Sequence, residues 1–300
     1  MGFPKAIDYH KPNKPKVLNG LGVLYVLSSV VYLFILHFFG VNAGQGVSAL
    51  TLAGCILFGG FLGLLDDWVD LKWRYKAFTP LLASLPLITL IIPAQWWTRV
   101  KWWDPVVWVD DPRANMATYI FGKINFGIYY YILIIPAIVV VTTNTVNQLG
   151  GLNGLETICP LIVMVGLAVV SPERSLLYVP IAACLILASL NYSGKIFVGN
   201  TGTYALGITI ASFSIIANVE QTLLISILPY IFNSSLIILN FFFHKTANLI
   251  LEGDKLYSRH RRSLQTIIAN NRPMSEHRIV QIISLIVLCS TAVAVLVLLI

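Results

Sequence analysis

Three carboxylates follow directly on an apolar stretch in the sequence LLDDWVDLKWRYK, residues 64–76. Asp66 and Asp70 are four residues apart, so on a helix they would share a face, while Asp67 would be turned away by about 100°. Carboxylates at a helix end can hold Mg²⁺, which completes its shell with water and substrate phosphates. The lysines and arginine that follow could neutralise those phosphates. The alternative is a charged turn between membrane helices, and this stretch alone leaves both interpretations open.

A second polar cluster, NTVNQLGGLNGLE, spans residues 144–156. Asn144 and Asn147 are three residues apart, on one helix face at the end of an apolar run, and amide oxygens are hard ligands that suit Mg²⁺. Two glycines then break the helix and let a ligand approach backbone N–H groups, and Asn153 and Glu156 follow. An ordinary helix end with asparagine and glycine is the alternative. It explains one asparagine and one glycine but not the whole cluster.

Two further clusters suit anions. In GKIFVGNTGTYALG, residues 194–207, a polar turn precedes an apolar helix that Thr201 or Thr203 would N-cap, and such a helix start can bind an anion. In YSRHRRS, residues 257–263, neighbouring arginines suit a diphosphate because the guanidinium binds phosphate as a bidentate fork. The alternative for this basic cluster is contact with anionic lipid headgroups.

The composition indicates a membrane protein. Hydrophobic residues make up 57 % of the chain and charged residues 11 %, whereas soluble domains carry about 25 % charged residues. The four cysteines lie in apolar runs without a C-x-x-C spacing, so we expect packing roles for them. No cleavable signal peptide is visible.

We predict an all-α, polytopic membrane protein with about nine transmembrane helices, because a span needs roughly 20 apolar residues. No repeat or soluble segment is apparent, so residues 1–300 are treated as one membrane-embedded domain. The nine candidate spans are residues 18–40, 46–65, 77–95, 127–147, 155–171, 176–190, 203–217, 222–243 and 279–300.

The distribution of positive charge predicts the orientation. With nine spans, one face collects 15 of the 20 Lys and Arg residues together with the N-terminus and all four polar clusters. The positive-inside rule makes this face cytoplasmic. The opposite face includes a Trp-rich segment, residues 95–126, which we expect in the headgroup layer.

The four clusters together resemble the polyprenyl-phosphate N-acetylhexosamine-1-phosphate transferases, in order and in spacing, from about residue 8 to the end of the chain. LKWRYK and RHR are similar to the eukaryotic and archaeal branch, which makes dolichyl-diphosphate N-acetylglucosamine for N-glycosylation. We do not find the histidine-rich motif in the last loop that is typical of the bacterial cell-wall branch. The resemblance implies an enzyme that moves a sugar 1-phosphate, expected to be N-acetylglucosamine 1-phosphate, from a UDP-sugar to a polyprenyl phosphate and releases UMP.

By position, the resemblance also implies residue roles. Asp66 and Asp67 match the acidic pair at the catalytic centre, and Lys76 matches a lysine that contacts phosphate. Asn147 matches a metal ligand for Mg²⁺, with Mn²⁺ as an alternative ion. Asn200 stands where the family has the metal-binding aspartate of V-G-D-T, so the amide would coordinate without charge and metal affinity should fall.

Substrate contacts are expected from several segments. Asn153 matches an asparagine that recognises uracil and Phe197 an aromatic residue that stacks on it, while Arg259, His260 and Arg261 match the loop that holds sugar and diphosphate. Two polar residues of the first two clusters are expected beside the substrate as well: Asp70 and Asn144.

The expected partners are a UDP-sugar, a polyprenyl or dolichyl phosphate and the lipid bilayer, with a homodimer as an option and no nucleic acid. We expect an integral membrane protein with its active site on the cytoplasmic face of an archaeal plasma membrane or of the endoplasmic reticulum. The family usually has a membrane helix before its first cytoplasmic loop, whereas this chain begins almost at that loop, so it is either trimmed or one helix shorter. Two other functions stay open: a catalytically degenerate relative, which Asn200 favours, and a transporter or flippase for an anionic lipid. Transporters often show internal repeats, and none is found.

Overall fold

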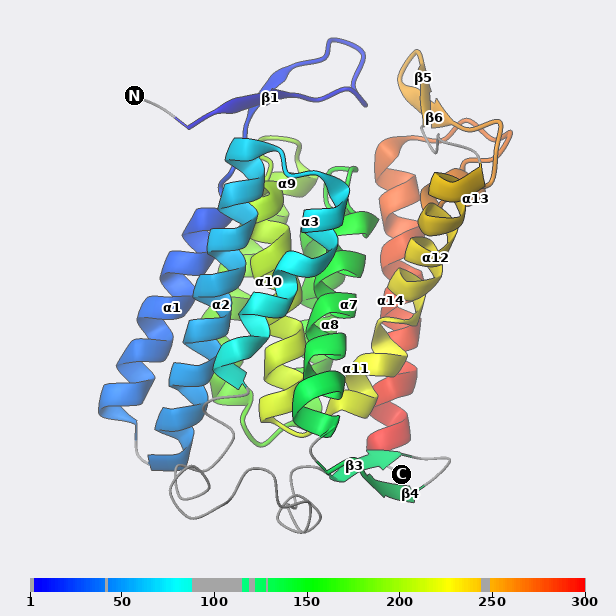
Figure 1. The fold of residues 1–300 in the computed structure, drawn as a ribbon. Coiled ribbons are helices and arrows are strands. Elements are labelled where there is room, and N and C mark those ends of the chain that lie inside the picture. Colours follow the sequence, from blue (N-terminus) through cyan, green and yellow to red (C-terminus); the bar gives the residue numbers. More distant parts are fainter. Residues whose placement is uncertain are drawn as a thin grey trace.

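The computed structural model is a bundle of helices whose axes run roughly along one direction (Figure 1). It describes residues 3–40, 43–87, 115–118, 122–127, 129–243 and 249–299. The α-helices are α1 (Gly22–Phe39), α2 (Ala43–Val69), α3 (Trp73–Phe78), α7 (Ile135–Leu149), α8 (Leu155–Val170), α9 (Tyr178–Tyr192), α10 (Gly199–Ile216), α11 (Glu220–Ser226), α12 (Leu228–Phe243), α13 (Leu264–Ile268) and α14 (Glu276–Leu299). The structure also has three short helical turns: η1 (Thr79–Ser84) follows α3, η3 (Tyr130–Ile134) precedes α7, and η4 (Arg174–Leu177) precedes α9.

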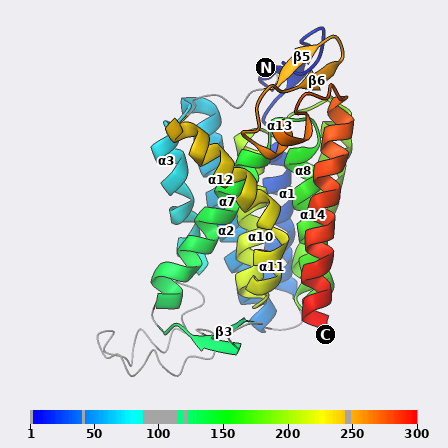
Figure 2. The same ribbon diagram turned by 90° about the vertical axis from the view of Figure 1, so that its right-hand side faces the viewer.

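Three antiparallel hairpins lie at the two ends of the bundle (Figures 1 and 2). At one end, β1 (Lys5–Ile7) pairs with β2 (Lys16–Leu18), and β5 (Ile250–Glu252) pairs with β6 (Lys255–Tyr257). At the other end, β3 (Asn115–Thr118) pairs with β4 (Gly122–Asn125). The bundle itself is helical as predicted, but strands of three or four residues are too short to leave a period-two pattern in the sequence.

The chain is a helical integral membrane protein. Five helical segments of the described residues are long and apolar enough to cross a membrane, and a sixth is added if α11 and α12, bent by 56°, count as one span. The five are Gly22–Phe39, Gln45–Val69, Tyr130–Leu149, Arg174–Tyr192 and Glu276–Leu299. The predicted number of nine is not confirmed. Helix α8 is apolar but only 16 residues long. The predicted span 77–95 extends beyond the described residues, and most of the Trp-rich segment lies outside them.

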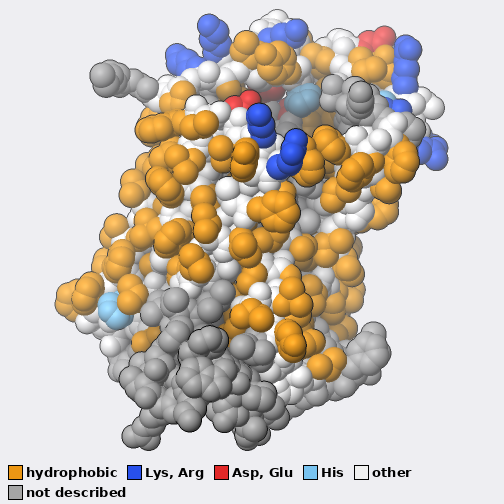
Figure 3. Space-filling view, viewed as in Figure 1, with side chains coloured by type: hydrophobic (Ala, Val, Ile, Leu, Met, Phe, Trp, Pro, Cys, Tyr) orange, Lys and Arg blue, Asp and Glu red, His pale blue; other side chains and the backbone are white. Residues whose placement is uncertain are grey.

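The charged side chains are not spread evenly over this bundle. In Figure 3, Lys and Arg gather at the end that carries the β1–β2 and β5–β6 hairpins, and the flank of the bundle is mostly hydrophobic. This is the distribution expected of helices whose sides contact lipid and whose charged end contacts water.

Helix α10 forms the centre of the bundle, and 15 of its 18 residues are buried. It packs against α1, α2, α7 and α8. Glycines allow the closest approaches: a methyl group at Gly63 of α2 would overlap the backbone of Asn200 and Thr201, and one at Gly22 of α1 would overlap Gly202. Small residues at crossings are typical of membrane helices, because packing rather than the hydrophobic effect holds them together. The beginning of α10 is therefore fixed tightly against α1 and α2.

Replacing Gly63 by Ala is expected to push α2 away from the first turn of α10. Backbone atoms on α10 cannot swing aside as a flexible side chain would, so overpacking should lower the free energy of unfolding by about 1–3 kcal/mol. Gly54, on the same helix, is the matched control, because a methyl group there meets only the ring of Pro86 at 3.3 Å. Thermal unfolding of both variants in detergent checks this, and an equal melting temperature for the two would contradict the close contact.

Candidate functional site

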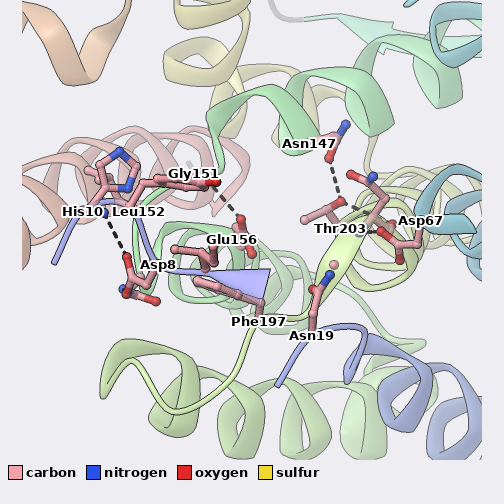
Figure 4. Close-up of a pocket in the computed structure, with 15 residues that line it drawn as sticks. Asp8, His10, Asn19, Asp67, Asn147, Gly151, Leu152, Glu156, Phe197 and Thr203 are labelled. Atoms are coloured by element: carbon pink, nitrogen blue, oxygen red, sulfur yellow. Dashed lines mark hydrogen bonds between the residues drawn. The ribbon is translucent and has the colours of Figure 1, made fainter. Parts of the chain in front are cut away.

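A polar pocket of about 320 Å³ opens at the charged end of the bundle. The turn between β1 and β2, the end of α2, the end of α7 with the loop after it, the start of α8 and the start of α10 all contribute to its lining. In Figure 4, Asp67, Thr203 and Asn147 lie on one side of this pocket, Asp8 and His10 lie on the other, and Glu156 and Phe197 lie between them. We call this cavity the polar pocket.

Asp67 holds the start of α10 in place. One carboxylate oxygen accepts the backbone N–H of Asn200 at 2.8 Å, and the other accepts the backbone N–H and the hydroxyl of Thr201 at 2.9 and 2.7 Å. Free N–H groups and the positive end of the helix dipole make a helix start a favourable partner for a carboxylate. The predicted N-caps, Thr201 and Thr203, are wrong, because α10 begins at Gly199 and Asp67 of α2 supplies the acceptors instead.

Asp66 is buried and pairs with Lys76. Its Oδ1 atom lies 3.0 Å from the Lys76 ammonium and accepts the backbone N–H of Leu71 at 3.0 Å, whereas its Oδ2 atom is buried without a protein partner. Asp70 also pairs with Lys76, at 3.2 Å, but its side chain is 96 % exposed. The predicted shared helix face of Asp66 and Asp70 is wrong, because α2 ends at Val69 and Asp70 adopts a positive φ of 48°.

The same two carboxylates govern the charge of Lys76. Burial alone would lower the pKa of its ammonium, but hydrogen bonds and attraction from Asp66 and Asp70 outweigh burial and raise the pKa above its ordinary value. Lys76 therefore stays positive at neutral pH, and its two carboxylate partners hold its side chain in place.

The amides expected to bind a metal line the polar pocket together. The Oδ1 atom of Asn147 accepts a hydrogen bond from the Thr203 hydroxyl at 2.7 Å. Asn200 lies in the first turn of α10 and lines the same pocket. Glu156, half-buried, accepts the backbone N–H of Gly151 at 3.2 Å and faces the same cavity. Gly151 has a φ of +102°, which a side chain would disfavour, so the predicted glycine break after α7 is confirmed.

Asn153 and Phe197 line the polar pocket on the side of the β1–β2 turn. The Asn153 side chain donates to Asp8 Oδ2 at 2.8 Å, and its backbone N–H donates to Glu276 at 2.8 Å. Its side-chain oxygen is buried without a partner. Phe197 is half-buried and precedes the start of α10, so its ring forms part of the apolar lining of the pocket.

A second cavity, of about 480 Å³ and mainly apolar lining, lies between α3, α7 and α12. We call it the apolar groove. Its polar lining residues include Lys76, Asn144 and Asn147, and Asn147 also lines the polar pocket. Asn144 donates to the carbonyls of Ala77 and Val140 at 3.0 and 2.9 Å, so it ties α7 to α3, and it is not among the residues that line the polar pocket.

The basic cluster after β6 lies apart from the polar pocket. None of Arg259, His260 and Arg261 is among the residues that line it. Arg261 donates to Asn270 at 2.7 Å and, with Arg262, lines a third cavity at the end of α12. Burial and then the charge of Arg262 lower the pKa of His260, so at neutral pH its imidazole is uncharged.

The structure thus brings five predicted residues into one pocket: Asp67, Asn147, Asn153, Phe197 and Asn200. Sequence reasoning missed Asp8, His10 and Asn19, which also line it, and named Thr203 only as a candidate N-cap at a possible anion site. The three missed residues lie in or next to the β1–β2 hairpin. The polar stretch DYHK was the only signal for two of them, and it does not reveal which part of the bundle the hairpin contacts.

The chain matches the model of a protein family described as glycosyl transferase family 4, over residues 49–218. It is 30 % identical over 235 residues to a putative UDP-N-acetylglucosamine–dolichyl-phosphate N-acetylglucosaminephosphotransferase of Saccharolobus solfataricus, with 75 % of this chain and 66 % of that protein covered. A protein of the same description from Sulfolobus acidocaldarius is 32 % identical over 227 residues, with 72 % and 62 % covered.

A UDP-N-acetylglucosamine–dolichyl-phosphate N-acetylglucosaminephosphotransferase of Schizosaccharomyces pombe is 28 % identical over 211 residues, covering 64 % of this chain and 44 % of that protein. The chain therefore spans less than two thirds of the length of each of these relatives.

We expect Asp67→Asn to loosen the start of α10. The variant keeps the size of the side chain but replaces an acceptor oxygen with an NH₂ group that faces other donors. Loss of charge-assisted hydrogen bonds should lower the free energy of unfolding by about 1–3 kcal/mol. Asp70→Asn is the matched control and should change it by less than about 0.5 kcal/mol, because its exposed ion pair contributes little. Thermal unfolding of purified protein tests this, and equal stability of the two variants would refute the anchoring role.

Proposed function

The chain belongs to glycosyl transferase family 4, and on that premise we propose that it transfers N-acetylglucosamine 1-phosphate from UDP-N-acetylglucosamine to a dolichyl-type polyprenyl phosphate. UMP is released, and the product is the first lipid-linked sugar in the assembly of an N-glycan. The names of the archaeal and yeast relatives support the choice of both substrates.

The observation that carries the proposal is the meeting of two unlike cavities at Asn147. The polar pocket has amides, carboxylates and aromatic rings, which suit a nucleotide-sugar. The apolar groove lies between membrane helices and has Lys76 among its lining residues, which suits an isoprenoid chain with a phosphate at its head. A reaction between a nucleotide diphosphate and a lipid phosphate needs this combination, because the two reacting phosphates must meet between water and lipid.

The chemistry is phosphoryl transfer. An oxygen of the lipid phosphate attacks the sugar-bearing phosphorus of the UDP-sugar, the bond from that phosphorus to the bridging oxygen breaks, and UMP leaves with the electron pair. Both reactants are anionic, so the barrier falls when positive charge neutralises their oxygens. Lys76 lines the apolar groove and is held there by Asp66, which places a permanent cation where the lipid phosphate would lie.

The amide and carboxylate oxygens of the polar pocket fit Mg²⁺ as ligands, with Mn²⁺ as an alternative ion. Mg²⁺ needs only one or two carboxylates and takes its other oxygens from water and phosphate. Asn147 and Asn200 would hold it, with the lone pair of Asp67 that its three hydrogen bonds leave free. The ion would supply charge neutralisation at the diphosphate. No group of three His, Cys, Asp or Glu side chains suited to a metal occurs in the described part of the chain, so the proposed site combines two amides with one carboxylate.

We further propose that the polar pocket faces the cytoplasm. Most Lys and Arg residues lie in the segments assigned to this face, and the β1–β2 hairpin, which carries Lys5 and Lys16, lies at the end of the bundle where the pocket opens (Figure 1). Nine spans and a homodimer remain predictions.

The direct test is product formation. Purified protein given UDP-N-acetylglucosamine and a polyprenyl phosphate should release UMP and form a lipid whose mass equals polyprenyl diphosphate plus N-acetylglucosamine. UDP-N-acetylgalactosamine is the control donor and should react more slowly. Phosphate-lipid binding without any UMP release would instead support a degenerate relative or an anionic-lipid transporter.

A second prediction concerns Asn200, which carries no charge in a pocket proposed to hold a cation. Asn200→Asp adds Coulomb attraction for Mg²⁺, so the Mg²⁺ concentration for half-maximal activity should fall by about tenfold or more. Asn19→Asp, which adds a carboxylate elsewhere in the lining of the pocket, is the matched control and should change the requirement less. Superimposable Mg²⁺ titrations of wild type and Asn200→Asp would mean that Asn200 does not contact the metal.

A further inference from the structure

A buried pair of side chains joins the β1–β2 turn to the loop after α7. Asp8 and Asn153 are each 2 % exposed, and the Asn153 side-chain nitrogen donates to Asp8 Oδ2 at 2.8 Å. The other carboxylate oxygen of Asp8 accepts the backbone N–H of His10 at 3.1 Å, and Lys11 lies 3.6 Å from Oδ2. Both Asp8 and Asn153 line the polar pocket.

This pair leaves only one orientation for the Asn153 amide. An ionised carboxylate is solely an acceptor, whereas an amide has one donating and one accepting end. The NH₂ group must therefore face Asp8, and the carbonyl oxygen must face the other way. That oxygen is buried and has no partner in the protein. A buried acceptor without a donor costs about 1–3 kcal/mol, so a ligand that offers an N–H group there would be favoured.

We propose that Asp8 is a positioning residue that sets the choice of nucleobase by fixing the orientation of the Asn153 amide. The inference rests on the proposed function, because it takes the ligand of the polar pocket to be a uridine nucleotide. Phe197, which lines the same pocket, gives the base a ring to stack on. Asp8 itself need not touch the nucleotide.

The hydrogen-bonding edges of the pyrimidines explain the selectivity. Uracil carries an N–H group at ring position 3, which can donate to the oxygen of Asn153. Cytosine has an unprotonated nitrogen at that position, whose lone pair would face the same oxygen. A site built to pair with one edge rejects a base with the opposite edge, because the buried group is then left unpaired. With the amide rotated by 180°, the preference would reverse.

The test compares UMP and CMP binding to the purified full chain in detergent by titration calorimetry. Wild type should bind UMP at least about tenfold more tightly than CMP, the scale of one unpaired buried group. Asp8→Asn presents Asn153 with a partner that can donate as well as accept, so the amide can rotate and the ratio should fall several-fold toward one. Asp8→Glu retains an acceptor-only partner and should recover part of the preference.

Two further variants keep the result interpretable. Lys11→Ala removes the cation beside Asp8 but leaves the Asp8 carboxylate as the partner of the Asn153 amide. The variant should therefore keep the wild-type ratio of UMP to CMP binding, even if its affinity for both nucleotides changes. Asp8→Ser, whose smaller side chain also donates and accepts, should lower the ratio as Asp8→Asn does, and it replaces that variant if Asp8→Asn does not fold. A merely structural role for Asp8 would weaken UMP and CMP binding equally and leave the ratio unchanged.

The outcomes separate this inference from the proposed function. A wild-type ratio in Asp8→Asn and Asp8→Ser, together with UMP binding and transferase activity, overturns the role of Asp8 and leaves the proposed function standing. Absence of UMP binding to wild type overturns both. A base preference that falls in these variants while wild type forms no lipid product supports the role of Asp8 in a nucleotide-binding relative that is not a transferase.

Discussion

A carboxylate on one helix holds the start of another, and the rest of the site depends on this contact. Asp67 of α2 accepts three hydrogen bonds from the first turn of α10, the helix that lies at the centre of the bundle. The contact is possible because Gly63 allows the two backbones to touch. It fixes Asn200 and, one turn later, Thr203, which in turn donates to Asn147 of α7. Three helices are thereby joined at the wall of the polar pocket.

The fold explains why polar chemistry can sit at the end of an apolar bundle. Backbone polar groups at a helix start are costly to bury without partners, especially near lipid. At the start of α10, the backbone N–H groups of Asn200 and Thr201 donate to Asp67, which also lines the polar pocket. The residues that stabilise the bundle and those that line the pocket are therefore partly the same. Asp66 follows the same logic, since its ion pair with Lys76 links the end of α2 to α3 beside the apolar groove.

Much of the site could be predicted from the sequence, because polar residues at the ends of apolar runs are conspicuous in a membrane protein. Asp67 and Asn147 stood out in this way, whereas Asn200 was singled out by the resemblance to a family that has an aspartate at this position. The start of α10 could not be predicted, since a cap donated by another helix leaves no signal beside the helix it caps. Nor could Asp8, whose partner Asn153 is 145 residues away in the chain. Such pairings depend on how the helices are arranged, which hydropathy does not determine.

Charge balance in the pocket follows from these pairings. A pocket for an anionic substrate cannot present several free carboxylates, because each would repel the phosphates. Asp67 is opposed by the helix start of α10, and Asp8 lies against the Asn153 amide and the Lys11 ammonium. The negative charge of both carboxylates is thus largely balanced by groups of the protein itself. Under the proposed function, the neutral amide at Asn200 fits the same pattern, because it would offer a hard oxygen to a cation and would add no repulsion toward a diphosphate. The cation and the substrate would then bind in a mutually dependent way, because each would supply charge that the protein does not provide.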